Sequence, residues 1–134
     1  MPMRTKTILV IDDDAEIRSL LRDLLEEDGF AVIAVEDAAD ALSLLSPDID
    51  LVLLDLVMPR AAMDGFTFLS KASERAQLVN TPVIVLSGLG DSVTHALDPA
   101  TATTLRIVSV VSKPLDMGAL LSMVRAALDM HDRS

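Results

Sequence analysis

The chain has 134 residues, of which 51% are apolar and only 2% aromatic, and it contains no cysteine. This length and composition fit one globular domain with an aliphatic core, and the lack of cysteine excludes a disulfide framework, a zinc–thiolate site and a thiol nucleophile. Its formal charge of −10 disfavours direct binding to nucleic acid or to an anionic membrane. We expect a single cytoplasmic domain over residues 1–134, with a core of about 6–130.

The first part of the chain alternates short apolar runs with segments of helical period. Residues 8–11 form a continuous apolar run that stops at three aspartates and is too short for a signal peptide or a membrane span. An apolar stripe over residues 17–25 then predicts a helix that Gly29 ends. A second run at 31–35 precedes a shorter predicted helix at 38–45.

The rest of the chain repeats this order. Apolar runs at 51–54 and 83–86 flank a predicted helix at about 65–77. The last run, 107–111, precedes a helix for which Asp116 is the predicted N-cap. The runs are continuous rather than alternating, as is typical of strands buried on both faces of a parallel sheet. Five strand–helix units therefore predict a doubly wound α/β fold with helices on both faces.

Polar side chains follow four of these runs, at the edge where ligands bind in such a sheet. They are Asp12, Asp13 and Asp14 after the first run, Asp55 after the third, Ser87 after the fourth and Lys113 after the fifth. Converging carboxylates repel one another unless a cation relieves them, and hard oxygen ligands without histidine or cysteine favour Mg²⁺. A carboxylate between a metal ion and a lysine can act as a nucleophile toward phosphorus. For any single acidic residue, a helix N-cap is an equally good explanation, and Asp14 fits it best.

At these residues the chain resembles the receiver (phosphoacceptor) domain of two-component response regulators, along essentially its whole length. Each matching segment is weak alone, but their order and spacing together are specific. The segments are residues 8–14, 50–59, 63–66, 82–88 and 112–115. The resemblance implies a flavodoxin-like fold with a five-stranded parallel sheet in the order 2-1-3-4-5.

The resemblance also implies a role for each polar residue at a strand end. Asp55 is the implied phosphoacceptor, Ser87 the switch hydroxyl and Lys113 the partner of the phosphoryl group. The implied Mg²⁺ ligands are Asp13, Asp12 directly or through water, Asp55 and the backbone carbonyl of Val57.

Receiver domains act with other proteins. By the resemblance, a sensor histidine kinase or a phosphotransfer protein supplies the phosphoryl group, and an output domain or effector protein receives the signal. Such domains catalyse only their own phosphorylation and dephosphorylation, so they are switches and not turnover enzymes. We expect no direct nucleic-acid or membrane partner, and the sequence leaves open whether the chain forms a homodimer.

Three features depart from the family pattern. The loop at 58–65 is slightly longer than usual, and the stretch 87–113 carries Asp98-Pro99 where a continuous fourth helix is normal. The switch aromatic of the family falls on Val110. The usual coupling of the switch hydroxyl to rotation of an aromatic ring therefore cannot operate in that form.

Two other functions stay open on the sequence alone. A phosphatase of the haloacid dehalogenase type would form its aspartyl phosphate on Asp12, although its signature after the first strand is only half met. A degenerate receiver would act as a protein-binding module without phosphorylation, and the altered Val110 keeps that reading open. In addition, residues 105–115 are similar to receivers that precede EAL-type cyclic-di-GMP phosphodiesterase domains.

Overall fold

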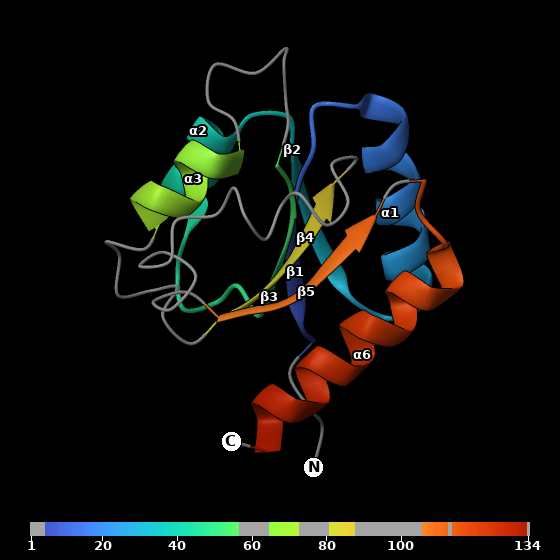
Figure 1. The fold of residues 1–134 in the computed structure, drawn as a ribbon. Coiled ribbons are helices and arrows are strands. Elements are labelled where there is room, and N and C mark those ends of the chain that lie inside the picture. The colour runs from blue at the N-terminus through green and yellow to red at the C-terminus, as the bar shows by residue number, and fades with distance from the viewer. Residues whose placement is uncertain (1–4, 57–64, 73–80, 88–105, 113, 134) are drawn as a thin grey trace.

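The computed structural model describes residues 5–56, 65–72, 81–87, 106–112 and 114–133 (Figure 1). Its strands are β1 (Thr7–Ile11), β2 (Ala31–Val35), β3 (Leu51–Asp55), β4 (Pro82–Ser87) and β5 (Arg106–Ser112). Its helices are α1 (Ala15–Glu27), α2 (Ala38–Leu44), α3 (Gly65–Ala72) and α6 (Met117–Arg133). Each strand agrees with its predicted run to within one residue at either end. The predicted continuation of α3 to about residue 77 and the Asp98-Pro99 interruption lie outside the described residues.

The five strands form one sheet in the order β2-β1-β3-β4-β5, and every neighbouring pair is parallel. The predicted doubly wound, flavodoxin-like architecture is therefore confirmed. Figure 1 shows α1 and α6 on one side of the sheet and α2 and α3 on the other. Because all strands run the same way, their carboxyl ends meet along one edge, where the polar side chains were expected.

Alternate residues of each strand pack into two separate core layers. In β1, Ile8 and Val10 belong to the layer under α1 and α6, whereas Leu9 and Ile11 belong to the layer under α2 and α3. All four side chains are fully buried. This two-sided burial explains why the strands are continuous apolar runs and do not alternate with polar residues.

Local side-chain chemistry sets the helix ends. The Asp14 carboxylate accepts hydrogen bonds from the backbone N–H groups of Glu16 and Ile17, at 2.9 and 3.3 Å, so it is the N-cap of α1. Gly29 has a φ of 93°, the left-handed conformation that commonly follows the end of a helix. The Asp116 carboxylate accepts from the Ala119 N–H at 3.0 Å, which confirms the predicted N-cap of α6. Among the described residues, no helix is long and apolar enough to span a bilayer.

Candidate functional site

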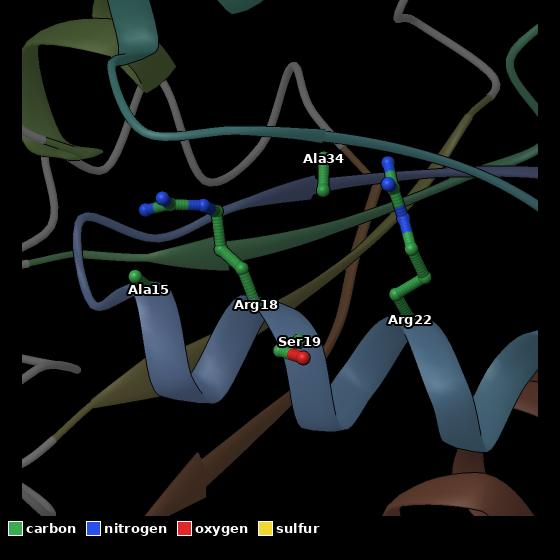
Figure 2. A pocket seen from close by; sticks show the side chains of 5 residues that line it. All are labelled: Ala15, Arg18, Ser19, Arg22 and Ala34. Carbon is green, nitrogen blue, oxygen red and sulfur yellow. The ribbon is translucent and has the colours of Figure 1, made fainter.

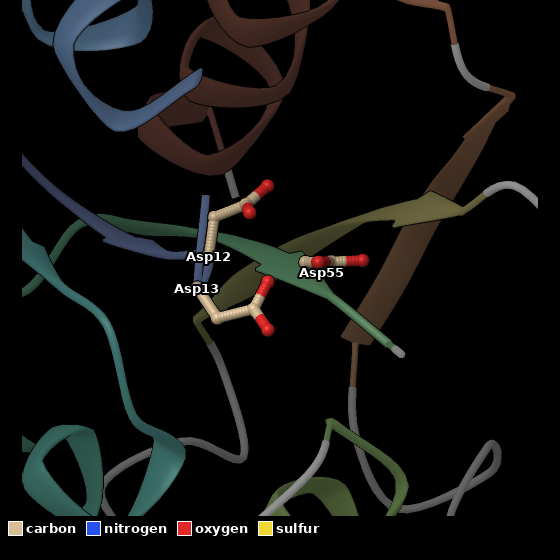
Figure 3. A group of neighbouring side chains, drawn as sticks. All are labelled: Asp12, Asp13 and Asp55. Atoms are coloured by element: carbon tan, nitrogen blue, oxygen red, sulfur yellow. The ribbon is translucent and has the colours of Figure 1, made fainter. Parts of the chain in front are cut away.

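Three carboxylates meet at the carboxyl edge of the sheet. Asp12 and Asp13 follow β1, and Asp55 is the last residue of β3. One oxygen from each carboxylate lies within 4.8 Å of the others. Asp12 and Asp55 are buried, and Asp13 is partly exposed. Figure 3 shows the three side chains gathered at the ends of these two strands. The sequence predicted this cluster, and the structure brings it together.

The parallel register of β1 and β3 explains why these side chains meet. Ile11 pairs with Leu54, so the next residue of each strand, Asp12 and Asp55, emerges at the same level of the sheet edge. Asp14 is not in this cluster, because its carboxylate caps α1 instead. The N-cap explanation is therefore correct for Asp14, whereas Asp12, Asp13 and Asp55 form the cluster.

Backbone and side-chain hydrogen bonds fix the position of Asp12. Its N–H donates to the Val35 carbonyl at 3.1 Å, which extends the β1–β2 pairing by one residue. Its Oδ1 accepts from the Asp14 N–H at 2.9 Å. Its carbonyl accepts from Nη1 of Arg18 at 2.8 Å. The first acidic residue of the cluster is thus held by both the sheet and α1.

Ser87 lies on the strand next to Asp55. It is fully buried at the end of β4, and its neighbour Leu86 pairs with Asp55 in the parallel register. Leu56 continues the pairing by donating its N–H to the Leu86 carbonyl at 3.2 Å. Leu86 is thus the partner of Asp55, the predicted phosphoacceptor. Ser87, which carries the predicted switch hydroxyl, is the next residue along β4.

Two of the predicted site residues, Val57 and Lys113, lie outside the described residues. Ser112, the residue before Lys113, pairs with Ser87 at the end of β5. The position that the family reserves for a switch aromatic, Val110, is on β5 opposite Val85, and 39% of its surface is exposed.

The donor set of the acidic cluster fits a hard divalent cation. Carboxylate oxygens are the ligands that Mg²⁺ takes in proteins, and an octahedral Mg²⁺ completes its shell with water and phosphate oxygens. A soft or strongly nitrogen-binding metal would require thiolate or imidazole ligands. Three carboxylates this close, two of them buried, also repel one another unless positive charge compensates them. Asp12, Asp13 and Asp55 are therefore suited to share one Mg²⁺.

Glycine at position 65 allows α3 to begin directly against the end of β3. A Cβ atom there would lie 2.5 Å from the Asp55 carbonyl oxygen and 2.5 Å from the Leu56 Cα. The Gly65 N–H instead donates to the Leu56 carbonyl at 2.9 Å. Gly65 lies in the matching segment 63–66, but this role could not be predicted, because a long-range approach of two backbones leaves no local signal in the sequence.

Arg18 was also missed by sequence reasoning. It lies on α1 between the apolar positions Ile17 and Leu20 and has the pattern of an ordinary solvent-facing helix residue. Its contact with the Asp12 carbonyl depends on how α1 folds back beside β1. The one available signal is its place in the first turn after the capping Asp14, whose carbonyl accepts the Arg18 N–H at 3.0 Å.

Comparison with known proteins agrees with this geometry. Residues 8–125 match the family model described as "Response regulator receiver domain". The transcriptional regulatory protein CpxR of Escherichia coli K12 is 39% identical over 121 residues, which cover 90% of this chain and 48% of CpxR. The chain thus spans about half the length of that relative.

Two solved structures show the same fold. One is the signal receiver domain of an HD domain-containing protein from Pseudomonas fluorescens Pf-5, with a TM-score of 0.80 and 29% identity, covering 99% of this chain and 93% of that one. The other is a CheY-like response regulator receiver domain protein from Methanospirillum hungatei JF-1, with a TM-score of 0.81 and 23% identity, covering 97% and 98%. The second supports the fold alone.

Proposed function

Because the chain belongs to the family of response regulator receiver domains, we propose that it is a phosphorylation-dependent signalling switch in which Asp55 accepts the phosphoryl group. The observation that carries this proposal is the acidic cluster, in which Asp55 shares one edge of the sheet with Asp12 and Asp13. Ser87 supports the proposal, because it is buried at the end of the adjacent strand and follows Leu86, the partner of Asp55. This combination is suited to phosphoryl transfer.

The proposed reaction moves one phosphoryl group. A carboxylate oxygen of Asp55 attacks phosphorus in line with the leaving group, the bond from phosphorus to the donor breaks, and an aspartyl phosphate forms. With phosphohistidine as donor, the bond broken is P–N, and the imidazole leaves. The attacking oxygen is fixed by the end of β3, so the protein contributes orientation more than acid–base chemistry.

The neighbouring residues compensate charge. We assign Asp12, Asp13, Asp55 and the backbone carbonyl of Val57 to hold Mg²⁺. When bound, this ion offsets the negative charge of the carboxylates and of the incoming phosphoryl oxygens. We assign the Ser87 hydroxyl to donate to one phosphoryl oxygen of the product and the Lys113 ammonium to a second one. These contacts form only with the phosphorylated protein, so they are the means by which phosphorylation changes the conformation.

The partners follow from the family. We propose a sensor histidine kinase or phosphotransfer protein as donor and an output domain or effector protein as receiver, in the cytoplasm. CpxR is named a transcriptional regulator, and this chain covers about half of it, so a regulatory output of that kind is part of the proposal. The degenerate module and the phosphatase using Asp12 gain no support from the comparisons. The likeness of residues 105–115 to receivers that precede EAL-type domains stays a prediction.

The test is incorporation of a phosphoryl group from acetyl phosphate with Mg²⁺, followed by intact mass. We expect wild type to gain one phosphoryl group and Asp55→Asn to gain none. Asp48→Asn, an exposed carboxylate outside the cluster, is the matched control and should react as wild type does. Labelling that survives Asp55→Asn and is lost in Asp12→Asn would indicate the phosphatase. No labelling of the folded wild type would indicate the degenerate module.

A further inference from the structure

A pocket of about 230 Å³ lies between α1 and the edge strand β2. It is lined by Ala15, Arg18, Ser19, Arg22 and Ala34. Figure 2 shows the two arginine side chains extending from α1 toward β2, with Ala34 between them. Since one water molecule takes up about 30 Å³ of the liquid, the pocket has room for a small anion together with part of its hydration shell.

Small side chains create this pocket. Ala34 belongs to the side of β2 that packs toward α1, as Val32 does, but its single methyl group leaves space that a larger residue would fill. Ala15 and Ser19 on α1 are also small. Short side chains therefore leave the space open, and the two long arginine side chains flank it.

The two guanidinium groups differ in how they are held. Nη1 of Arg18 donates to the Asp12 carbonyl at 2.8 Å, and Nη2 lies 4.0 Å from Glu36. Arg22 is exposed, and no hydrogen bond or ion pair joins it to another described residue. Residues four apart on a helix are neighbours, so these like charges repel one another. An anion between them would relieve that repulsion.

The chemistry of the pocket selects an oxyanion. Guanidinium groups present paired N–H donors that match the oxygens of phosphate, and the Ser19 hydroxyl offers a further donor. The only acidic side chain in contact with these arginines among the described residues is Glu36, which is 72% exposed and at the limit of ion-pair distance. Such an exposed pair is weak, so a bound oxyanion can replace it.

We propose that this pocket binds a phosphate group between Arg18 and Arg22, at a site separate from the phosphoacceptor Asp55. The ligand class is inorganic phosphate or a soluble phosphate monoester. The negative charge of the chain disfavours an anionic bilayer as the source. The site would allow an otherwise acidic protein to bind an anion beside α1. Arg18 connects this site to Asp12, because its guanidinium group donates to the Asp12 carbonyl.

The test is a titration with inorganic phosphate, followed by amide chemical shifts, in EDTA so that no metal bridges phosphate to the acidic cluster. We expect saturable shifts at Ser19, Arg22 and Ala34. Arg22→Gln should weaken binding about tenfold or more, because one charge-assisted contact is lost. Lys71→Gln makes the same charge change on α3, across the sheet, and should leave the affinity unchanged.

A gain-of-affinity variant keeps the test independent of folding defects. Glu36→Gln removes the competing carboxylate and should tighten phosphate binding about two- to fivefold. Glu27→Gln, an exposed charge change at the end of α1, should not. Shifts that are absent from α1 and β2, that chloride reproduces at equal ionic strength, or that neither Arg22→Gln nor Glu36→Gln alters would overturn the proposal.

A parallel arm distinguishes the source of the phosphate. Vesicles of phosphatidylcholine containing phosphatidic acid are sedimented with the protein. We expect no co-sedimentation, which together with the free-phosphate shifts supports a soluble ligand. Co-sedimentation that Arg22→Gln abolishes would overturn the soluble assignment in favour of a lipid headgroup. Neither the phosphate titration nor the vesicle experiment uses Mg²⁺ or acetyl phosphate. A negative result in them therefore does not bear on the phosphorylation of Asp55, which the acetyl phosphate experiment tests separately.

Discussion

The carbonyl oxygen of Asp55 lies so close to Gly65 that a Cβ atom on the glycine would come within 2.5 Å of it. The start of α3 is therefore packed against the backbone of the proposed phosphoacceptor. Any side chain at position 65 must push α3 and the end of β3 apart, because both colliding groups are backbone atoms. The fold thus couples the placement of α3 to the geometry of the acidic site.

From this contact we predict that Gly65→Ala destabilises the protein by about 1–3 kcal/mol, as overpacking of a tight contact does. It should also slow phosphorylation by acetyl phosphate, because the end of β3 shifts. Urea unfolding and the rate of mass gain measure the two effects. Gly118→Ala is the matched control, since its Cβ would meet only ordinary contact at 3.6 Å. Equal stability and equal rates for both variants would contradict the prediction.

A buried carboxylate joins the start of β1 to the start of β3. Asp50 Oδ2 accepts from the Thr7 N–H at 2.7 Å, and the Asp50 N–H donates to the Thr7 carbonyl at 2.8 Å. Asp50→Ala should lower the free energy of unfolding by about 1–3 kcal/mol, because the Thr7 N–H loses its acceptor. Asp48→Ala removes an exposed carboxylate nearby and should change stability by less than about 0.5 kcal/mol. Urea unfolding decides whether the two variants differ.

Mg²⁺ affinity should depend on Asp13. Loss of a residue that supports a metal ligand commonly lowers metal affinity tenfold or more, so if Asp13 is a direct ligand as proposed, Asp13→Asn should weaken Mg²⁺ binding by at least about tenfold. Asp14→Asn makes the same charge change one residue further on and keeps an oxygen that can cap α1. Calorimetric titration with Mg²⁺ should separate them. Similar affinities for the two variants would remove Asp13 from the ligand set.

An ion pair joins Asp28, the residue that follows α1, to Arg125 on α6, and it should make stability depend on pH. Arg125 donates from Nε to Asp28 Oδ2 at 2.8 Å and from Nη2 to Oδ1. The hydrogen bond with Arg125 lowers the pKa of Asp28 below its usual value. A carboxyl group with a depressed folded pKa adds stability above its unfolded pKa, near pH 4, and that stability is lost as the pH falls through the folded pKa.

Arg125→Gln should therefore be less stable than wild type at about pH 6, and this difference should shrink below about pH 4. Added salt should reduce the difference at pH 6 as well, because the pair is at the surface. Urea unfolding at several pH values measures it. A difference between wild type and variant that stays constant from about pH 6 to pH 3 would show that Asp28 is not the group responsible.

The strands and the acidic cluster could be predicted because their signals are local. The run 51–54 is apolar along its whole length, and the strand then ends in the charged residue Asp55. The doubly wound order then brings the ends of β1 and β3 together, since neighbouring parallel strands share an edge. For this reason, the sequence alone predicts that Asp12, Asp13 and Asp55 lie close together.

Contacts between distant backbones and side chains could not be predicted in the same way. The approach of Gly65 to Asp55 depends on where α3 begins, and the hydrogen bond from Arg18 to the Asp12 carbonyl depends on the angle of α1. The pocket beside Ala34 depends on the distance between a helix and an edge strand. Residue types alone carry no information on these distances. The roles of Val57 and Lys113 stay predictions.

The position of the phosphoryl group is the most direct test of the account. After reaction with acetyl phosphate and Mg²⁺, borohydride converts an aspartyl phosphate to homoserine, and trypsin then separates the candidate residues. Asp12 and Asp13 fall in the peptide 7–18, and Asp55 falls in the peptide 23–60. We predict homoserine at position 55 in the second peptide and unmodified aspartate throughout the first. Homoserine at position 12 or 13, or label retained in Asp55→Asn, would contradict the assignment of Asp55 as the phosphoacceptor.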